Sequence, residues 1–176
     1  MIWEILTHKL KPFVSIATLK QVYYALVYQQ LQYCISCWGG VPPSRLKALT
    51  VLHKRCVRTI CSVSRLTPSQ PLFFYLRFLK IQDIYCLQVA KIMHRFTRNT
   101  WFGSYRMNTI KSIHSHNTRI SHTNFFQQAF STNATKQALS INGPRIWSKV
   151  PDAFKNLNIY LFKKTYKNYL VEKYNC

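Results

Sequence analysis

Carboxylates are the scarcest reactive side chains in this sequence of 176 residues. Only Glu4, Asp83, Asp152 and Glu172 carry one, and they lie far apart along the chain. Metal-dependent nucleotidyl transfer needs two or three carboxylates that converge on Mg²⁺ and leave coordination positions open for phosphate oxygens. Glycosidases need a comparable pair. We therefore expect no catalytic residue, and assign Asp83 to the start of a helix and Asp152 to a turn.

Cysteine and histidine give two weaker signals for a metal site. Cys34 and Cys37 have the spacing of a zinc knuckle or a redox pair, but no second pair follows at a suitable distance. His114 and His116 have no acidic or cysteine ligand near them in sequence. We expect a solvated loop around the histidines and mostly buried free thiols, with no bound metal, no cofactor and no disulfide.

Basic side chains dominate the charge of the protein. Lys and Arg number 25 against four acidic residues, which gives a net charge of +21. A folded protein of this size rarely keeps so much self-repulsion unless a polyanion neutralises it, so nucleic acid is the first candidate partner.

The clearest basic face lies on the helix predicted to begin after Ser44. Its helical period places Lys47, Thr50, Lys54 and Arg58 together, opposite an apolar stripe. A row of this kind can follow the phosphates of a nucleic acid, and Thr50 would add a hydroxyl contact. The predicted nucleic-acid-binding residues of this helix are Lys47, Thr50, Lys54, Arg55 and Arg58.

Two further helices repeat the scheme. Lys91, Arg95 and Arg98 lie on the outer face of a helix predicted over 82–98, and 163–167 carries three lysines in the last helix. A single charged face is usually only a solvated surface. Three such faces with few acidic residues between them favour binding to a nucleic-acid backbone.

A long apolar segment is predicted to organise these faces. Residues 18–38 form one helix, with Thr18 and Gln21 as a capping box and Gly39-Gly40 as the stop. Apolar residues occur on most of its sides, so we expect neighbouring helices to cover it. The expected inner face is Leu19, Val22, Leu26, Tyr33 and Cys37.

The other elements follow from helix signals along the chain. Residues 1–14 resemble the end of a helix that begins before this chain does, Ser44 caps the next long helix, and Pro71 opens a short one. Residues 125–130 and 138–141 are candidate strands in a polar segment. Pro144 opens a short helix that anchors Trp147, and Asn158 caps the last helix.

The predicted fold class is therefore mainly α. It is a thumb-like helical bundle with a short irregular or two-stranded β insert and a C-terminal helix. The bundle covers 1–98, the polar insert 99–142, and the Gly-Pro-x-x-Trp segment with the C-terminal helix 143–176, which we expect to form one compact unit with the bundle. The sequence has no apolar run of 18 residues and no secretion signal, so we expect an intracellular, nuclear protein without membrane contact.

A series of short motifs resembles one known family in order and spacing. The series comprises 19–28, 31–34, 38–39, 52–58, 71–73, Leu79 with Ile81 and 83–85, 116–119, 143–147 with Pro151, 162–163 and 169–170. It is similar to the region after the palm in reverse transcriptases of non-LTR retrotransposons, the jockey and CR1-like LINE elements. The chain departs from that pattern at Ser148, where the family has Asn, and at Val150, where it has Leu.

The resemblance implies the thumb and carboxy-terminal extension of an RNA-directed DNA polymerase. Such a thumb packs on the palm and fingers and grips the backbone of template and primer, so RNA, DNA or their hybrid and the missing palm and fingers are the implied partners. The Tyr-x-Asp-Asp turn of the palm and the endonuclease domain are absent from this sequence. We expect a truncated product without enzymatic activity of its own.

Two other hypotheses remain open at this point. The chain could be a non-functional, partner-dependent relic whose apolar faces stay exposed. It could also be held at a membrane surface by its positive charge. We rank the membrane hypothesis last because the apolar positions fit a packed bundle.

Overall fold

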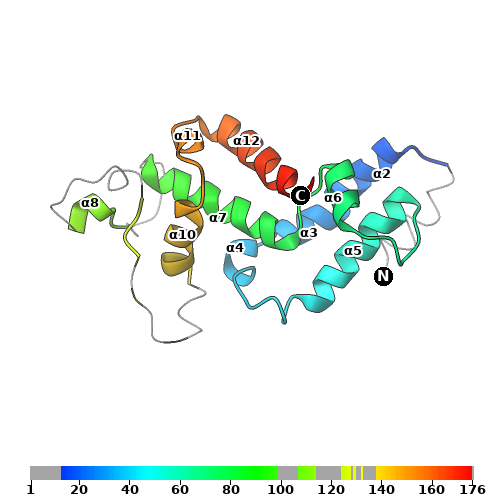
Figure 1. Cartoon of the computed structure of the whole chain (residues 1–176), viewed down its shortest axis with the longest axis horizontal. Coiled ribbons are helices and arrows are strands. Elements are labelled where there is room, and N and C mark those ends of the chain that lie inside the picture. The colour runs from blue at the N-terminus through cyan, green and yellow to red at the C-terminus, as the bar shows by residue number, and fades with distance from the viewer. Residues whose placement is uncertain are drawn as a thin grey trace. The chain divides into compact units, whose positions relative to one another are not determined.

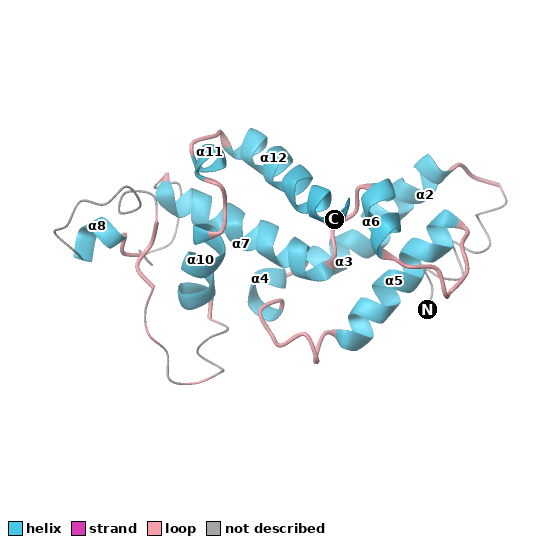
Figure 2. Ribbon diagram, viewed as in Figure 1, coloured by secondary structure: helices cyan, strands magenta, loops and turns pink. Residues whose placement is uncertain are grey.

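Helices make up the regular secondary structure of the computed structural model, which describes residues 13–98, 107–113, 124–127, 129, 132 and 138–175. Figure 1 labels the helices, and Figure 2 shows only helix and loop in this part of the chain. The mainly helical fold class is confirmed. The short β insert is not found in the described residues, where strand-like pairing is limited to one isolated antiparallel bridge between Thr109 and Phe125.

The long helix predicted over 18–38 is divided into several pieces. α2 (Ile16–Val22) is capped by Ser15, whose hydroxyl accepts the Thr18 N–H at 3.3 Å, so the predicted Thr18 cap is wrong. π-helical turns follow in η1 (Tyr23–Tyr28), and α3 (Gln29–Gln32) continues the helix. The chain then breaks at Cys34, which has a positive φ of 48°, before α4 (Ile35–Trp38). The predicted end before Gly39-Gly40 is confirmed.

The π-helical turns explain why most of the predicted inner face is wrong, although Leu19 is buried as predicted. The buried residues are Leu19, Tyr23, Leu31 and Ile35, which are spaced four or eight residues apart along the chain. Leu26 and Tyr33 are exposed. An ordinary α-helix repeats every 3.6 residues, and a π-helical segment is wider. A period of four therefore brings a different set of side chains to the core.

The next three helices lie close to their predicted positions. α5 (Lys47–Cys61) begins without a side-chain cap, so the Ser44 cap is wrong, and it ends at Ser62 in the left-handed conformation. α6 (Gln70–Leu76) has Pro71 in its first turn, as predicted, and buries Phe73 and Leu76. α7 (Ile81–Thr97) is the longest helix described.

Two compact units can be separated in the chain. Unit 1 holds the described residues of Met1–Ile35, Val41–Ile84 and Asn168–Cys176. Its core is built on Tyr23, whose ring stacks on Phe78 at 3.9 Å between centroids and whose hydroxyl lies 2.9 Å from Nε2 of His53. Phe73 meets the edge of the His53 ring at 5.0 Å.

Unit 2 holds the described residues of Ser36–Gly40 and Tyr85–Lys167. It contains α8 (Ile110–Ile113), α10 (Leu139–Ser148), α11 (Asp152–Lys155) and most of α7 and α12 (Ile159–Glu172). Trp147 is fully buried there and contacts the rings of His94 and Phe162. The predicted anchoring by Trp147 is confirmed.

Two predictions for unit 2 are wrong. Residues 139–141 belong to α10 and not to a strand, and Pro144 lies inside that helix and does not open it. Gly143 is buried against α7, because a Cβ added to it would lie 2.6 Å from Sδ of Met93. The Gly-Pro-x-x-Trp segment is thus a packed helix.

The end of the described chain is helical as predicted. Asn158 caps α12, since its side-chain oxygen accepts the Tyr160 N–H at 3.1 Å. The short helix η2 (Lys173–Asn175) follows and buries Tyr174. None of the described helices has the length and apolar character needed to cross a membrane.

Candidate functional site

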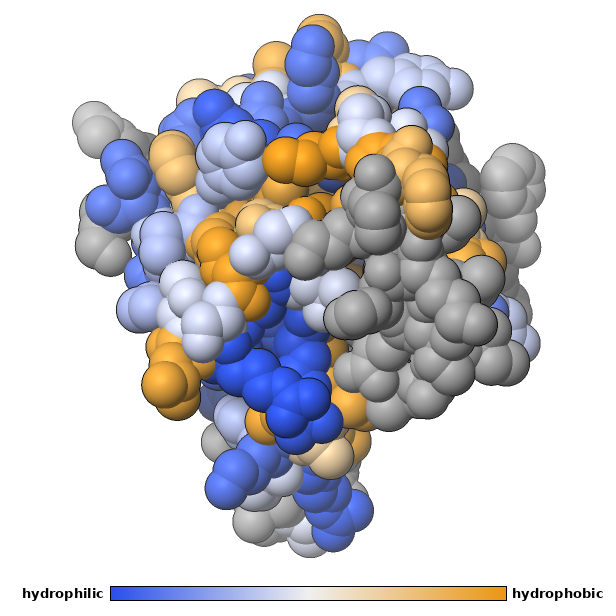
Figure 3. All heavy atoms as spheres, turned by 90° about the vertical axis from the view of Figure 1, so that its right-hand side faces the viewer, coloured by the Kyte–Doolittle hydropathy of each residue, from blue (hydrophilic) through white to orange (hydrophobic). Residues whose placement is uncertain are grey.

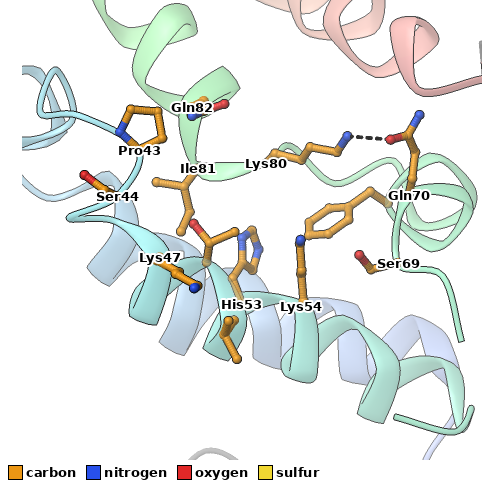
Figure 4. Close-up of a pocket in the computed structure, with 13 residues that line it drawn as sticks. Pro43, Ser44, Lys47, His53, Lys54, Ser69, Gln70, Lys80, Ile81 and Gln82 are labelled. Atoms are coloured by element: carbon orange, nitrogen blue, oxygen red, sulfur yellow. Dashed lines mark hydrogen bonds between the residues drawn. The ribbon is translucent and has the colours of Figure 1, made fainter. Parts of the chain in front are cut away.

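A groove of about 550 Å³ lies within unit 1, between α5, α6 and the start of α7. Figure 4 shows the residues that surround it. We call it the basic groove. Its lining includes Pro43, Ser44, Lys47, Thr50, Val51, His53, Lys54, Ser69, Gln70, Phe73, Lys80, Ile81 and Gln82.

Three lysines supply the charge of the basic groove. Lys47 and Lys54 come from α5, and Lys80 enters from the opposite wall, just before α7 (Figure 4). Among the described residues, no carboxylate lines the groove. Partial burial lowers the pKa of Lys80, nearby Asp83 opposes this lowering, and the charge of Lys54 adds to it.

The amino-terminal end of α5 adds to the positive potential. Ser44 and Lys47 bring this end to the groove, and the first turn of the 15-residue helix contains no acidic residue and no side-chain cap. The N-terminus of a helix carries a partial positive charge that favours anions. His53 also lines the groove, but burial lowers its pKa to about 4, so it is neutral at pH 7. The full charges are therefore those of the lysines.

The other residues predicted for this helix have different surroundings. The Thr50 hydroxyl donates to the Leu46 carbonyl at 2.8 Å, so its hydrogen is not directed at a phosphate. Nε of Arg58 donates to the Thr67 carbonyl at 2.8 Å and ties down the loop after α5. Arg55 is exposed, and neither arginine lines the groove.

The second predicted set, Lys91, Arg95 and Arg98, belongs to unit 2. Nζ of Lys91 donates to the Gln88 side chain at 3.1 Å, and Arg98 donates to the Asn156 carbonyl at 2.7 Å. The pKa of Lys91 is lowered by burial first, and then by the charges of Lys163 and Arg95. Unit 2 thus has a cationic cluster of its own, shared between α7 and α12.

The Lys80 wall of the basic groove is fixed by the end of the chain. The Tyr174 hydroxyl accepts the Lys80 N–H at 3.1 Å, and the Tyr174 carbonyl accepts from Nε2 of Gln70 at 3.3 Å. Gln70 in turn accepts from Nζ of Lys80 at 3.1 Å. The Lys80 ammonium lies 4.3 Å from the centroid of the Tyr174 ring. Lys80 is thereby oriented by three contacts.

Sequence reasoning missed Lys80 because it belongs to no helix face. It stands between Leu79 and Ile81, in the short connection from α6 to α7, so helical periodicity assigns it no direction. Gln70 and Gln82 were missed for the same reason, since each lies at the start of a helix and not along a face. A lysine between two buried residues is the one signal that singles it out.

Cysteines and metal-ligating groups add nothing to the site. Cys56 is buried, but Cys34 and Cys37 are exposed, so the prediction of mostly buried thiols is wrong for this pair. Within the described ranges, no group of three or more His, Cys, Asp or Glu side chains comes together as a metal site. His114 and His116 lie outside the described residues.

Comparison with known proteins yields no relative. No protein-family model, no curated protein and no solved structure matches this chain.

Proposed function

We propose that this protein binds the sugar-phosphate backbone of nucleic acid through the basic groove. The observation that carries the proposal is that Lys47, Lys54 and Lys80 line one hollow, whose lining has no carboxylate in the part of the chain that the structure describes. Lysine ammonium groups and an uncapped helix N-terminus are both favourable to phosphate. The net charge of +21 would draw a polyanion toward the surface from a distance.

The role in a larger process rests on the sequence resemblance. As the thumb and carboxy-terminal region of a non-LTR retrotransposon reverse transcriptase, the chain would grip template and primer while the palm performs the chemistry. It has no Tyr-x-Asp-Asp motif. We therefore assign a binding function to these residues.

Salt dependence of binding tests the proposal. The affinity of the protein for a labelled RNA–DNA hybrid is measured by fluorescence anisotropy over a series of KCl concentrations. Each phosphate contact contributes roughly 0.9 to the slope of log affinity against log salt. Changing Lys47, Lys54 and Lys80 to Gln should reduce that slope by roughly 2 to 3.

A second triple variant provides the control. Lys20, Arg65 and Arg77 lie in unit 1 but outside the basic groove, so changing them to Gln removes the same charge elsewhere. This variant should retain most of the wild-type slope. Equal slopes for the two variants would reject the groove as the binding site, and absence of binding by the wild type would reject the function.

A partner-dependent protein without nucleic-acid binding is the second candidate. A smaller hollow of about 230 Å³ in unit 1 is lined mainly by apolar residues, among them Leu26, Leu31 and Leu52. Leu66 is 93% exposed, and Figure 3 shows hydrophobic surface beside hydrophilic surface on one face. Size-exclusion chromatography in moderate salt discriminates between the two candidates. Self-association that persists when RNA–DNA hybrid is added would favour the partner-dependent protein.

A further inference from the structure

The basic groove is more than a cationic surface. Its lining also contains Pro43 and Val51, whose apolar side chains are exposed, whereas the lining residues Phe73 and Ile81 are only 2% exposed. A base-paired duplex presents phosphates outward and keeps its bases stacked inside, so binding of its backbone needs only the lysines. The apolar lining therefore favours a ligand that also has an apolar face.

The size of the groove limits that ligand. A hollow of about 550 Å³ falls in the range that accommodates one small organic ligand. A single nucleotide that has left the stack belongs to this size class, and it joins a charged phosphate to a flat base that can lie on apolar side chains. A regular duplex is too wide to enter such a hollow and can only lie across its rim.

Polar side chains that make no hydrogen bond in the described part of the chain lie beside the apolar lining. Gln82 lies on the α7 side of the groove, and Ser44 and Ser69 lie near its two ends (Figure 4). Their side chains make no hydrogen bond within the described part of the chain. Gln70, in contrast, is held by Lys80 and by the Tyr174 carbonyl. Amide and hydroxyl groups of this kind suit the edge of a base or the hydroxyls of a sugar.

We infer that the basic groove takes one unpaired nucleotide of a nucleic-acid strand. Its phosphate lies against Lys47, Lys54 and Lys80, and its sugar and base lie against Pro43 and Val51. The inference rests on the proposed backbone binding and goes beyond it, because it assigns a preference for unpaired over fully paired nucleic acid at this site.

The amino-terminal end of α5 supports this placement of the phosphate. Lys47 is the first residue of α5, and Lys54 lies two turns further along the same helix. A phosphate near Lys47 would meet both the ammonium group and the positive end of the helix dipole. A negative charge there would also relieve the repulsion between Lys54 and Lys80 that contributes to the lowered pKa of Lys80.

A pair of matched variants tests the inference without removing a cation. Val51 is 39% exposed and lines the groove, whereas Val63 is 36% exposed and does not. Val51→Trp should fill the groove, and Val63→Trp places the same bulk just beyond the end of α5. Gln82→Trp, at an exposed position on the α7 side, fills the groove independently of α5.

Affinities are measured for oligo(dT) and for a blunt RNA–DNA hybrid of the same phosphate count, at one salt concentration. Wild type should bind oligo(dT) more tightly. Val51→Trp and Gln82→Trp should weaken oligo(dT) binding by about tenfold, the size of one lost base-stacking contact, and weaken hybrid binding much less. Val63→Trp should change neither affinity. Adenosine 5′-monophosphate should shift the NMR signals of the groove residues, and inorganic phosphate should shift only those near the lysines.

Failure of the inference can be told apart from failure of the proposed function. Equal weakening of both ligands by Val51→Trp, or no weakening of oligo(dT), would overturn the unpaired-nucleotide site while hybrid binding still supports the backbone function. A wild-type protein that binds neither ligand would overturn both.

Discussion

The hydroxyl of Tyr174 donates a hydrogen bond to the carboxylate of Asp83, 91 residues earlier in the chain. The same oxygen accepts the backbone N–H of Lys80. Burial is the main influence on Asp83 and raises its pKa, while the Tyr174 hydrogen bond acts in the opposite direction. This carboxylate is thus structural: it joins η2 to the first turn of α7 behind the groove.

Removing the Tyr174 hydroxyl should destabilise unit 1. Tyr174→Phe leaves the Asp83 carboxylate and the Lys80 N–H without their partner, at a cost of about 1 to 3 kcal/mol in the free energy of unfolding. Urea denaturation measures the loss. Tyr160→Phe is the control because Tyr160 is 81% exposed, and its unfolding midpoint should match that of wild type. Equal midpoints for all three proteins would contradict the structural role of the pair.

Acidification should destabilise the protein through His53. Burial lowers its pKa in the folded state from 6.5 to about 4, whereas in the unfolded chain it keeps the ordinary value. Neutral His53 therefore stabilises the folded protein fully above pH 6.5. Its contribution to the free energy of unfolding falls as the pH drops toward 4, and the loss levels off there at about 3 kcal/mol.

The comparison with His53→Gln isolates this effect. Burial also lowers the pKa of His94, but His94 is present in both proteins and cancels in the difference. Unfolding free energies measured from pH 7.5 to pH 4 should fall more steeply for wild type than for the variant. Parallel curves would show that His53 titrates normally.

Gly143→Ala should destabilise unit 2 unless Met93 is made smaller. In Gly143→Ala the new Cβ would meet Sδ of the fully buried Met93, and overpacking of this kind costs about 1 to 3 kcal/mol. In a Met93→Val background the same substitution should cost at least about 1 kcal/mol less, because the crowded sulfur is gone. A double-mutant cycle by urea denaturation measures this coupling; a coupling of zero would place the strain elsewhere.

Lys155 should hold the segment around Asn124. Its Nζ donates to the Asn124 side chain at 2.8 Å and to Asp152 at 2.7 Å, and the Asn124 carbonyl accepts the Ile110 N–H. Lys155→Met should speed amide hydrogen exchange of Ile110 about fivefold, the equivalent of about 1 kcal/mol. Lys149→Met, at an exposed position after α10, is the control. Unchanged amide hydrogen exchange at Ile110 in Lys155→Met would show that Lys155 does not hold the segment around Asn124.

The helices were largely predictable because their apolar periods are strong. α5, α6, α7 and α12 lie close to their expected positions, since each has an uninterrupted helical pattern, and Asn158 also marks the start of α12. Changes of helical register were not predictable. The π-helical turns of η1 and the left-handed Cys34 shift the inner face of the first helical segment, and no composition rule signals them.

The candidate site was predictable in part. Lys47 and Lys54 follow from the period of α5 alone. Lys80 enters the groove from a connection between helices, so its place depends on tertiary packing against Tyr174, far away in sequence. Arg58 was assigned to phosphate, but a local hydrogen bond to Thr67 engages it. A face drawn on a helical wheel does not show which neighbours a long side chain will meet.

The π-helical turns of η1 also act as a rotational spacer. Each residue of an α-helix turns the chain by about 100°, so eight residues of ordinary α-helix would rotate Leu31 by about 80° away from the direction of Tyr23. The wider winding of η1 takes up this excess, and Leu31 and Ile35 are buried like Tyr23. A single deletion between Tyr23 and Tyr28 would leave seven residues, about two turns of ordinary α-helix, and would keep Leu31 and Ile35 facing the interior. The segment can therefore lose one residue there without turning its inner face outward.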